Sequence, residues 1–124
     1  MSRAARSRLG QRLAGWIFEH MSSALPLRRL RETDTLIAFH HPRPAYPLHI
    51  LLIPKAARAS VIDLTADDSA FMVDLFTTVA SMVAEFDLER CGYHLIANGG
   101  VYQDVPQLHF HLISQDYRLT VEGR

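Results

Sequence analysis

A long amphipathic segment in the middle of the chain is the feature that most constrains the fold. Thr65-Ala-Asp-Asp68 is typical of a capping box, which begins a helix, and Gly92 is a natural C-terminal stop. Between them, apolar residues recur at spacings of three and four and form one stripe, made of Met72, Leu75, Phe76, Val79, Met82, Val83 and Phe86. The pattern predicts one long helix over residues 65–92, with the aromatic and methionine side chains of the stripe in the core rather than in a cofactor site.

Three strand-length runs precede this helix. Residues 27–32 and 35–39 are separated by a polar pair suited to a turn, so they predict a hairpin. Residues 41–47 contain three prolines, which remove amide donors and fix φ, so this segment is expected to be a surface loop. Residues 48–53 are nearly all apolar and stop at Pro54, which predicts a central strand covered on both faces.

Two further strands are predicted after the helix, over residues 93–97 and 108–114, and a polar loop containing glycines joins them. Residues 13–24 carry apolar positions at helical spacing and predict a short N-terminal helix. About five strands, with one long helix between the third and the fourth, make an α+β domain on a mainly antiparallel sheet.

The chain of 124 residues has room for one domain. We expect a basic, flexible N-terminal tail over residues 1–12, a domain over residues 13–114 and a C-terminal tail over residues 115–124. The first segment carries four arginines ahead of the first acidic residue, Glu19. An organelle transit peptide is therefore the alternative to a plain tail.

Composition and charge argue against several classes of function. Thirteen Lys and Arg balance thirteen Asp and Glu, so the chain lacks the basic field that bulk nucleic-acid binding needs. Cys91 is the only cysteine, which excludes an internal disulfide and a cysteine-based zinc site and favours a reducing compartment. No apolar run approaches the roughly 20 residues of a membrane-spanning helix. We expect a soluble, cytoplasmic protein with no membrane partner.

The chemistry is expected on the last predicted strand. Residues two apart on a strand point to the same face, about 6.7 Å from one another, so Gln107, His109 and His111 share one face. The alternating apolar residues take the other face, where the long helix can bury them: Leu108, Phe110 and Leu112. One face of this strand is therefore core, and the other carries two imidazoles and an amide.

Three interpretations of the paired histidines stay open. In the first they bind zinc or iron, with His49 or His94 completing the set, although no carboxylate or thiol lies at ligand spacing. In the second, one imidazole attacks phosphorus and forms a covalent phosphoramidate, while its neighbours bind the phosphate oxygens and supply a proton to the leaving group. In the third, the protein binds a nucleotide without cleaving it.

The segment QDVPQLHFHLIS resembles the motif of the histidine triad (HIT) family, His-φ-His-φ-His-φ-φ, where φ is apolar. LIAFHHPRPAYPLHILLIPK is similar to that family's hairpin, loop and central strand, and GYHLIANGG resembles its strand ending in an asparagine. The resemblance spans residues 15–114. It implies a HIT-like domain that forms a homodimer, requires no cofactor, and hydrolyses or transfers nucleoside monophosphates from phosphoramidates, dinucleoside polyphosphates or related substrates.

The resemblance also assigns roles to individual residues. His109 matches the nucleophile that takes a nucleotidyl group, and His111 matches the last histidine of the triad. Asn98 matches the loop asparagine, and His49 the histidine of the central strand. Gln107 stands where the first histidine belongs, and a glutamine amide can hydrogen-bond but cannot exchange a proton near neutral pH.

Other candidate binding residues surround these positions. His41 stands where nucleoside-binding members usually carry an acidic residue that grips the ribose hydroxyls. Gly99 and Gly100 let backbone amides approach an anion, unless they simply form a turn. Asp104 could orient an imidazole or cap its loop. The zinc-binding cysteines of some HIT proteins have no counterpart, so no metal is expected.

Together, the same-face histidines and the resemblance to the HIT family imply a nucleotide hydrolase or nucleotidyl transferase that acts at an α-phosphate through a covalent intermediate on His109. The alternative, favoured by Gln107 and His41, is a nucleotide-binding or regulatory protein with little or no turnover. The expected partners are a nucleotide substrate and a second copy of the chain. Candidate dimer contacts are the long helix and the strand 93–97, because a domain of this size buries only a modest fraction of its own surface.

Overall fold

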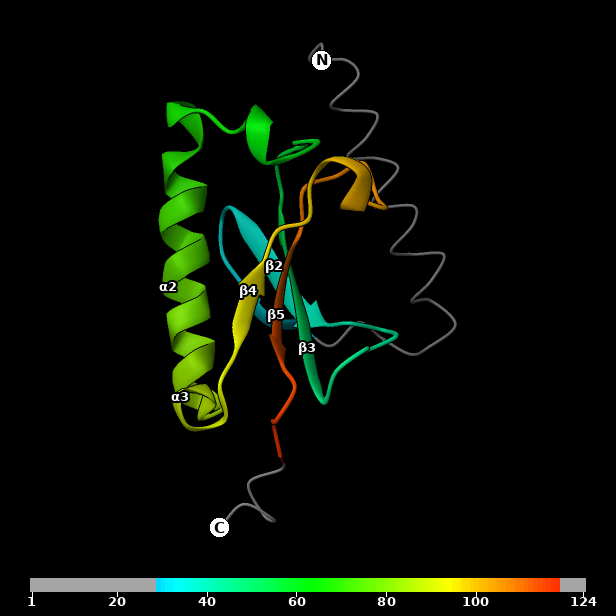
Figure 1. The fold of residues 1–124 in the computed structure, drawn as a ribbon. Helices are drawn as coiled ribbons and strands as arrows, with labels where there is room; N and C mark the ends of the chain where they lie inside the picture. The colour runs from blue at the N-terminus through cyan, green and yellow to red at the C-terminus, as the bar shows by residue number, and fades with distance from the viewer. Residues whose placement is uncertain (1–28, 119–124) are drawn as a thin grey trace.

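The computed structural model describes residues 29–118, which form one antiparallel sheet with the main helix along one face (Figure 1). Within these residues the sheet has five strands in the spatial order β1-β2-β3-β5-β4, and every neighbouring pair is antiparallel. The strands are β1 (Arg29–Glu32), β2 (Leu36–His40), β3 (Leu48–Pro54), β4 (His94–Ile96) and β5 (Phe110–Ser114). The predicted α+β class, the hairpin and the central strand are confirmed.

The main helix, α2 (Ser69–Glu85), runs along one face of the sheet, as Figure 1 shows. The other helical segments are short: the 3₁₀ helices η2 (Val61–Asp63), η3 (Ala66–Asp68) and η4 (Gly100–Tyr102), and the one-turn helix α3 (Leu88–Cys91). The predicted N-terminal helix over residues 13–24 and the basic tail over residues 1–12 lie outside the described residues. No helix within residues 29–118 is long and apolar enough to cross a membrane.

The start of the helical region follows the predicted capping box. The Thr65 hydroxyl accepts a hydrogen bond from the Asp67 N–H at 3.2 Å, and the Thr65 N–H donates to the Asp68 carboxylate at 3.0 Å. These bonds satisfy amide donors that a helix start leaves without partners. The first turn is the 3₁₀ helix η3, and α2 continues from Ser69.

The prediction of one uninterrupted helix to Gly92 is wrong. Helix α2 ends at Glu85, and Asp87 adopts a left-handed conformation with φ 55° before α3 begins at Leu88. On a straight helix Leu88 would lie about 140° around the axis from Leu75, away from the sheet. The break instead buries Leu88 completely in the core, which explains why the helix does not continue.

Phe76 is a second correction, because it was expected in the core and is 63% exposed. Leu75, Val79 and Met82 occupy the buried side of α2, and Phe76 lies about 100° around the axis from Leu75. The apolar stripe is therefore wider than the surface that the sheet covers. Its outermost aromatic residue remains at the surface of the chain.

The core is divided between the two faces of the sheet. Even-numbered residues of β3 and β5 pack with α2 in the larger cluster, among them Ile50, Leu52 and Leu112. Odd-numbered residues point to the opposite face, where Phe39, Leu51 and Ile53 form a smaller cluster. All seven residues of β3 are buried, so the predicted coverage of this strand on both faces is confirmed. The alternation assigns His49 and His111 to the face away from α2.

Candidate functional site

Four imidazoles gather on the sheet face away from α2. His49 lies on β3 and His111 on the neighbouring β5, whereas His41 follows β2 and His109 precedes β5. The ring centroids of His41 and His49 are 4.4 Å apart, those of His49 and His111 5.1 Å, and those of His109 and His111 5.0 Å. The fold thus brings together histidines that lie up to 70 residues apart in the sequence.

Two of these imidazoles are joined directly. His49 Nε2 and His111 Nδ1 are 2.9 Å apart, which is a hydrogen-bond distance, and the backbone N–H of Ala45 donates to His49 Nδ1 at 3.1 Å. Tyr46 packs edge-on against the His49 ring, with centroids 5.4 Å apart. Both ring nitrogens of the buried His49 therefore have partners, which fixes its orientation.

The electrostatic environment disfavours positive charge on the histidines. Burial, followed by repulsion from neighbouring imidazoles, lowers the pKa of His49 to about 4 and the pKa of His111 to about 4. Burial and the His109 imidazole also lower the pKa of His41. At neutral pH, His49 and His111 are therefore uncharged, and each has one ring nitrogen with a proton and one with a lone pair.

His109 is oriented by a backbone carbonyl. Its Nδ1 lies 2.7 Å from the carbonyl oxygen of Gln107, and because a carbonyl can only accept, Nδ1 carries the proton. In the neutral ring, Nε2 then keeps its lone pair. An imidazole with one nitrogen anchored as a donor and the other free as a lone pair has the protonation state of a nucleophile or a general base.

The hydrogen bonds of the Gln107 side chain go to main-chain carbonyls and not to the imidazoles. Gln107 is 1% exposed, and its Nε2 lies at the limiting distance of 3.5 Å from the carbonyl oxygens of Ala56 and Leu108. Strand β5 begins only at Phe110, but Leu108 still packs with Phe110 and Leu112 in the α2 cluster, as the alternation predicts. Residue 107 acts on His109 through its main chain.

The loop between β4 and β5 contributes backbone geometry. Gly100 has a φ of 58°, a conformation that favours glycine, as expected for this position. Gly99 precedes η4, and the Gln103 side chain ties the loop to the carbonyl of Ala59 at 2.6 Å. The ring and hydrogen-bond contacts described for the four imidazoles include neither Asn98 nor the exposed Asp104.

Other predicted candidates lie elsewhere. His94, proposed as a third metal ligand, is exposed on the edge strand β4. Within residues 29–118, no three His, Cys, Asp or Glu side chains are arranged to hold a metal ion. The sequence reasoning missed Tyr46 and the amide of Ala45. Both lie in the loop that leads directly into β3 and His49, and this closeness in sequence could have indicated them.

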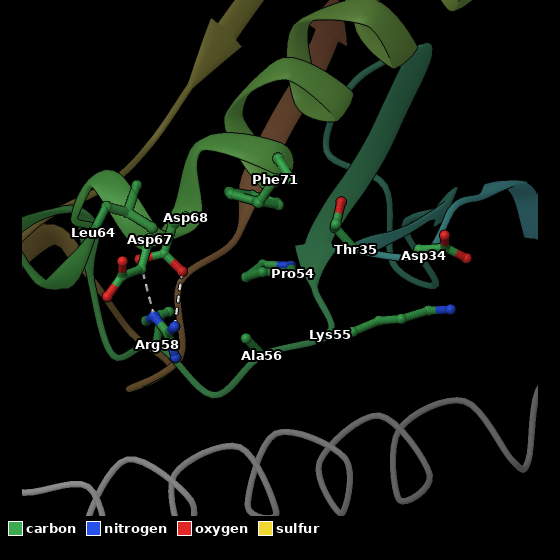
Figure 2. Close-up of a pocket in the computed structure, with 11 residues that line it drawn as sticks. Asp34, Thr35, Pro54, Lys55, Ala56, Arg58, Leu64, Asp67, Asp68 and Phe71 are labelled. Atoms are coloured by element: carbon green, nitrogen blue, oxygen red, sulfur yellow. Dashed lines mark hydrogen bonds and ion pairs between the residues drawn. The ribbon is translucent and has the colours of Figure 1, made fainter.

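A separate pocket lies at the N-terminal end of α2 (Figure 2). It has a volume of about 240 Å³, and Pro54, Leu64 and Phe71 supply its apolar walls. Its cationic side chains are already paired: Arg58 with Asp68 at 2.7 Å, as Figure 2 shows, and Lys55 with Glu32 at 2.8 Å. None of the four imidazoles lines this pocket, so the histidine cluster remains the candidate site.

Comparisons with known proteins agree with this fold. An uncharacterized 13.2 kDa HIT-like protein of Azospirillum brasilense is 33% identical over 93 residues, which cover 73% of this chain and 76% of that protein. A solved HIT family hydrolase from Clostridium thermocellum superposes with a TM-score of 0.68 at 29% identity, covering 80% of this chain and 88% of that one. A histidine triad nucleotide-binding protein from Candida albicans gives a TM-score of 0.66 at 25% identity, with coverages of 82% and 74%.

The family assignment follows from the extent of the match as well as from the fold. The HIT domain matches residues 23–118, which include all five strands, α2 and the four clustered histidines. The chain therefore belongs to the HIT domain family.

Proposed function

We propose that this protein hydrolyses or transfers a nucleotide at its α-phosphate through a covalent intermediate on His109. The observation that carries the proposal is the hydrogen bond from His109 Nδ1–H to the Gln107 carbonyl, which leaves Nε2 free to attack. Membership in the HIT family supports it, as do the descriptions of two structural neighbours as a hydrolase and a nucleotide-binding protein.

The proposed reaction has two displacement steps. In the first, the lone pair of His109 Nε2 forms an N–P bond as the bond from phosphorus to the leaving group breaks, and the leaving group keeps the electron pair and takes a proton from water. In the second, the oxygen of a water molecule attacks phosphorus, the N–P pair returns to Nε2, and the water's proton passes to solvent. A nucleoside monophosphate is released; an alcohol or amine in place of water gives transfer instead.

Neighbouring groups are proposed to bind the substrate. His111 lies beside His109 and is proposed to donate a hydrogen bond to a phosphate oxygen. His49 holds His111, and His41 lies against His49 at the edge of the cluster, where it is proposed to contact the nucleoside. We also propose that the loop Asn98-Gly99-Gly100 borders the phosphate. Asp104, in the segment that leads to β5, is proposed to do the same.

Gln107 is proposed to be a functional variant of the first histidine of the triad. Its side chain is buried against the carbonyl of Ala56, whereas its own carbonyl binds His109. A carbonyl is present whatever side chain occupies the position. The reaction is therefore expected to proceed without an imidazole at residue 107.

The direct test is a panel of adenosine and guanosine phosphoramidates and dinucleoside polyphosphates. We expect the wild type to release nucleoside monophosphate from at least one substrate class and His109→Asn to release none. His94→Asn removes an exposed imidazole outside the cluster and serves as the matched control, with activity near that of the wild type. Equal inactivity of the wild type and His109→Asn across the panel would refute the catalytic proposal.

The second candidate is a nucleotide-binding or regulatory protein with little turnover. The absence of an acid-base side chain at residue 107 favours it, because general acid-base catalysis contributes on the order of 10²- to 10⁴-fold. Calorimetric binding of nucleoside monophosphates at micromolar concentration, without any release of product from the panel, would select this alternative. Detection of a nucleotidylated His109 would remove it.

A homodimer is also proposed. β4 is an edge strand of the described sheet, and the exposed side of α2 carries Val73 and Phe76. A second copy that pairs with this edge would continue the sheet and cover apolar surface. Sedimentation should give a species of about twice 14.0 kDa, and a species near 14.0 kDa at micromolar concentration would contradict the dimer. The single cysteine, Cys91, fits a cytoplasmic location, which is likewise a proposal.

A further inference from the structure

The proline-rich loop between β2 and β3 directs its amides to histidines. Three of the residues 41–47 are prolines and carry no N–H. The N–H of Arg43 donates to His41 Nδ1 at 3.0 Å, and the N–H of Ala45 donates to His49 Nδ1 at 3.1 Å. Backbone N–H groups in a loop usually bind carbonyl oxygens or water. In this loop, two of the N–H groups of the non-proline residues bind imidazole nitrogens instead.

These bonds determine where the imidazole protons lie. A backbone N–H can only donate, so the Nδ1 that receives it must offer a lone pair, and in a neutral ring the proton then lies on Nε2. His41 and His49 are therefore Nε2–H tautomers. His49 Nε2–H in turn donates to His111 Nδ1 at 2.9 Å, which makes His111 an Nε2–H tautomer as well. The N–H group of Ala45 therefore determines the tautomers of two histidines, His49 and His111.

The remaining histidine has the opposite state. The Gln107 carbonyl holds the proton of His109 on Nδ1. The Nδ1 lone pairs of His41, His49 and His111 all accept hydrogen bonds, so within residues 29–118 the cluster has one ring lone pair without a donor, at His109 Nε2. His111 and His41 each keep an Nε2–H to offer to an incoming oxygen. In the reverse tautomers these atoms would present lone pairs and would repel an oxyanion.

We propose that the backbone N–H groups of Arg43 and Ala45 are positioning groups, which fix the tautomers of His41, His49 and His111 so that the cluster offers N–H donors and a single nucleophilic nitrogen. The tautomers themselves follow from the geometry alone. Only their catalytic consequence rests on the proposed function. Burial is the first cause of the lowered pKa values of His41, His49 and His111, which keep these three rings neutral at pH 7, where tautomers matter.

The wild-type protein allows the first test. Long-range ¹H–¹⁵N NMR spectra of the uniformly ¹⁵N-labelled chain distinguish Nδ1–H from Nε2–H imidazoles without any substrate. We expect Nε2–H signals for His41, His49 and His111 and an Nδ1–H signal for His109 at neutral pH. An Nδ1–H tautomer at His49 or His111, or rapid exchange between the two tautomers there, would overturn the proposal.

The second test removes the amide. Ala45→Pro deletes the N–H, whereas Ala45→Ser keeps it and is the matched control, because the Ala45 side chain is exposed. We expect Ala45→Pro to mix the tautomers of His49 and His111 while His109 stays Nδ1–H, and Ala45→Ser to keep the wild-type pattern. A folded Ala45→Pro protein that keeps the wild-type pattern at both histidines would refute the proposal. If Ala45→Pro does not fold, Arg43→Pro against Arg43→Ala applies the same comparison to His41.

Kinetics separate this proposal from the proposed function. The loss of one orienting hydrogen bond predicts a kcat for Ala45→Pro about three- to tenfold below that of Ala45→Ser, with a KM that differs less than kcat. Equal kcat values, despite altered tautomers, would refute the positioning role. An inactive wild type with the expected tautomers would refute the proposed function and leave the tautomer assignment standing.

Discussion

Acidification should destabilise this protein through the hydrogen-bonded pair of His49 and His111. The pKa values of His49 and His111 lie near 4 in the folded chain, below the ordinary value of about 6.5 that applies after unfolding. Between these two values the unfolded chain binds protons that the folded chain does not. The free energy of unfolding is therefore highest above about pH 6.5 and falls as the pH decreases towards about 4.

The size of the effect follows from the two pKa values. At about pH 5, a histidine with a pKa of about 6.5 is protonated in the unfolded chain, which stabilises that state by about 2 kcal/mol, while a folded-state pKa of about 4 gives almost no compensation. Each of the two histidines thus removes about 2 kcal/mol of unfolding free energy between about pH 7.5 and pH 5. Together they remove up to about 4 kcal/mol, a large part of the stability of a small domain.

Urea denaturation at the two pH values measures this loss. The double variant His49→Gln/His111→Gln lacks both titrating groups and keeps all carboxylates. Its loss of unfolding free energy between the two pH values should therefore be up to about 4 kcal/mol smaller than that of the wild type. His94→Gln, at an exposed position, controls for the loss of an imidazole as such. The same pH dependence in the wild type and the double variant would refute the reasoning that these two imidazoles are held neutral.

Three further substitutions and one control test the fold and the site. Leu52→Ala, at a fully buried β3 position that packs in the α2 cluster, should cost about 2–5 kcal/mol of unfolding free energy, whereas Ile62→Ala, at a residue that is 91% exposed, should cost less than about 0.5 kcal/mol in the same urea titration. Thr65→Ala removes the hydroxyl that caps η3 and should cost about 1 kcal/mol; an unchanged midpoint would contradict the capping role. Gln107→His should raise turnover less than about tenfold, because the 107 carbonyl already orients His109, and a gain of a thousandfold would favour the binding-module alternative.

Local patterns were sufficient to predict most of the fold. The apolar run of β3, the capping box at Thr65 and the turn between β1 and β2 each depend on neighbouring residues, and each is present as expected. The end of α2 depends on tertiary packing instead. The helix breaks at Asp87 because Leu88 gains a place in the core, and the stripe alone contains no information about the surface it must fit.

The candidate site was likewise predicted only in part. The pairing of His109 with His111 follows from strand periodicity, and the structure brings the two rings together. Periodicity did not predict the partners of the Gln107 side chain, which are the carbonyls of Ala56 and Leu108. Periodicity also describes side chains only. The orienting groups of this cluster are main-chain atoms of Ala45 and Gln107, whose positions depend on loop conformation.

The covalent intermediate is the most direct test of the proposed function. The wild type is mixed with excess nucleoside phosphoramidate, quenched within the first turnovers under alkaline denaturing conditions that preserve an N–P bond, and analysed by intact-mass and peptide mass spectrometry. We expect a mass gain of one nucleotidyl group on the peptide that contains His109, and no gain in His109→Asn. Sustained turnover without an adduct, or an adduct on any other residue, would contradict a nucleophilic His109.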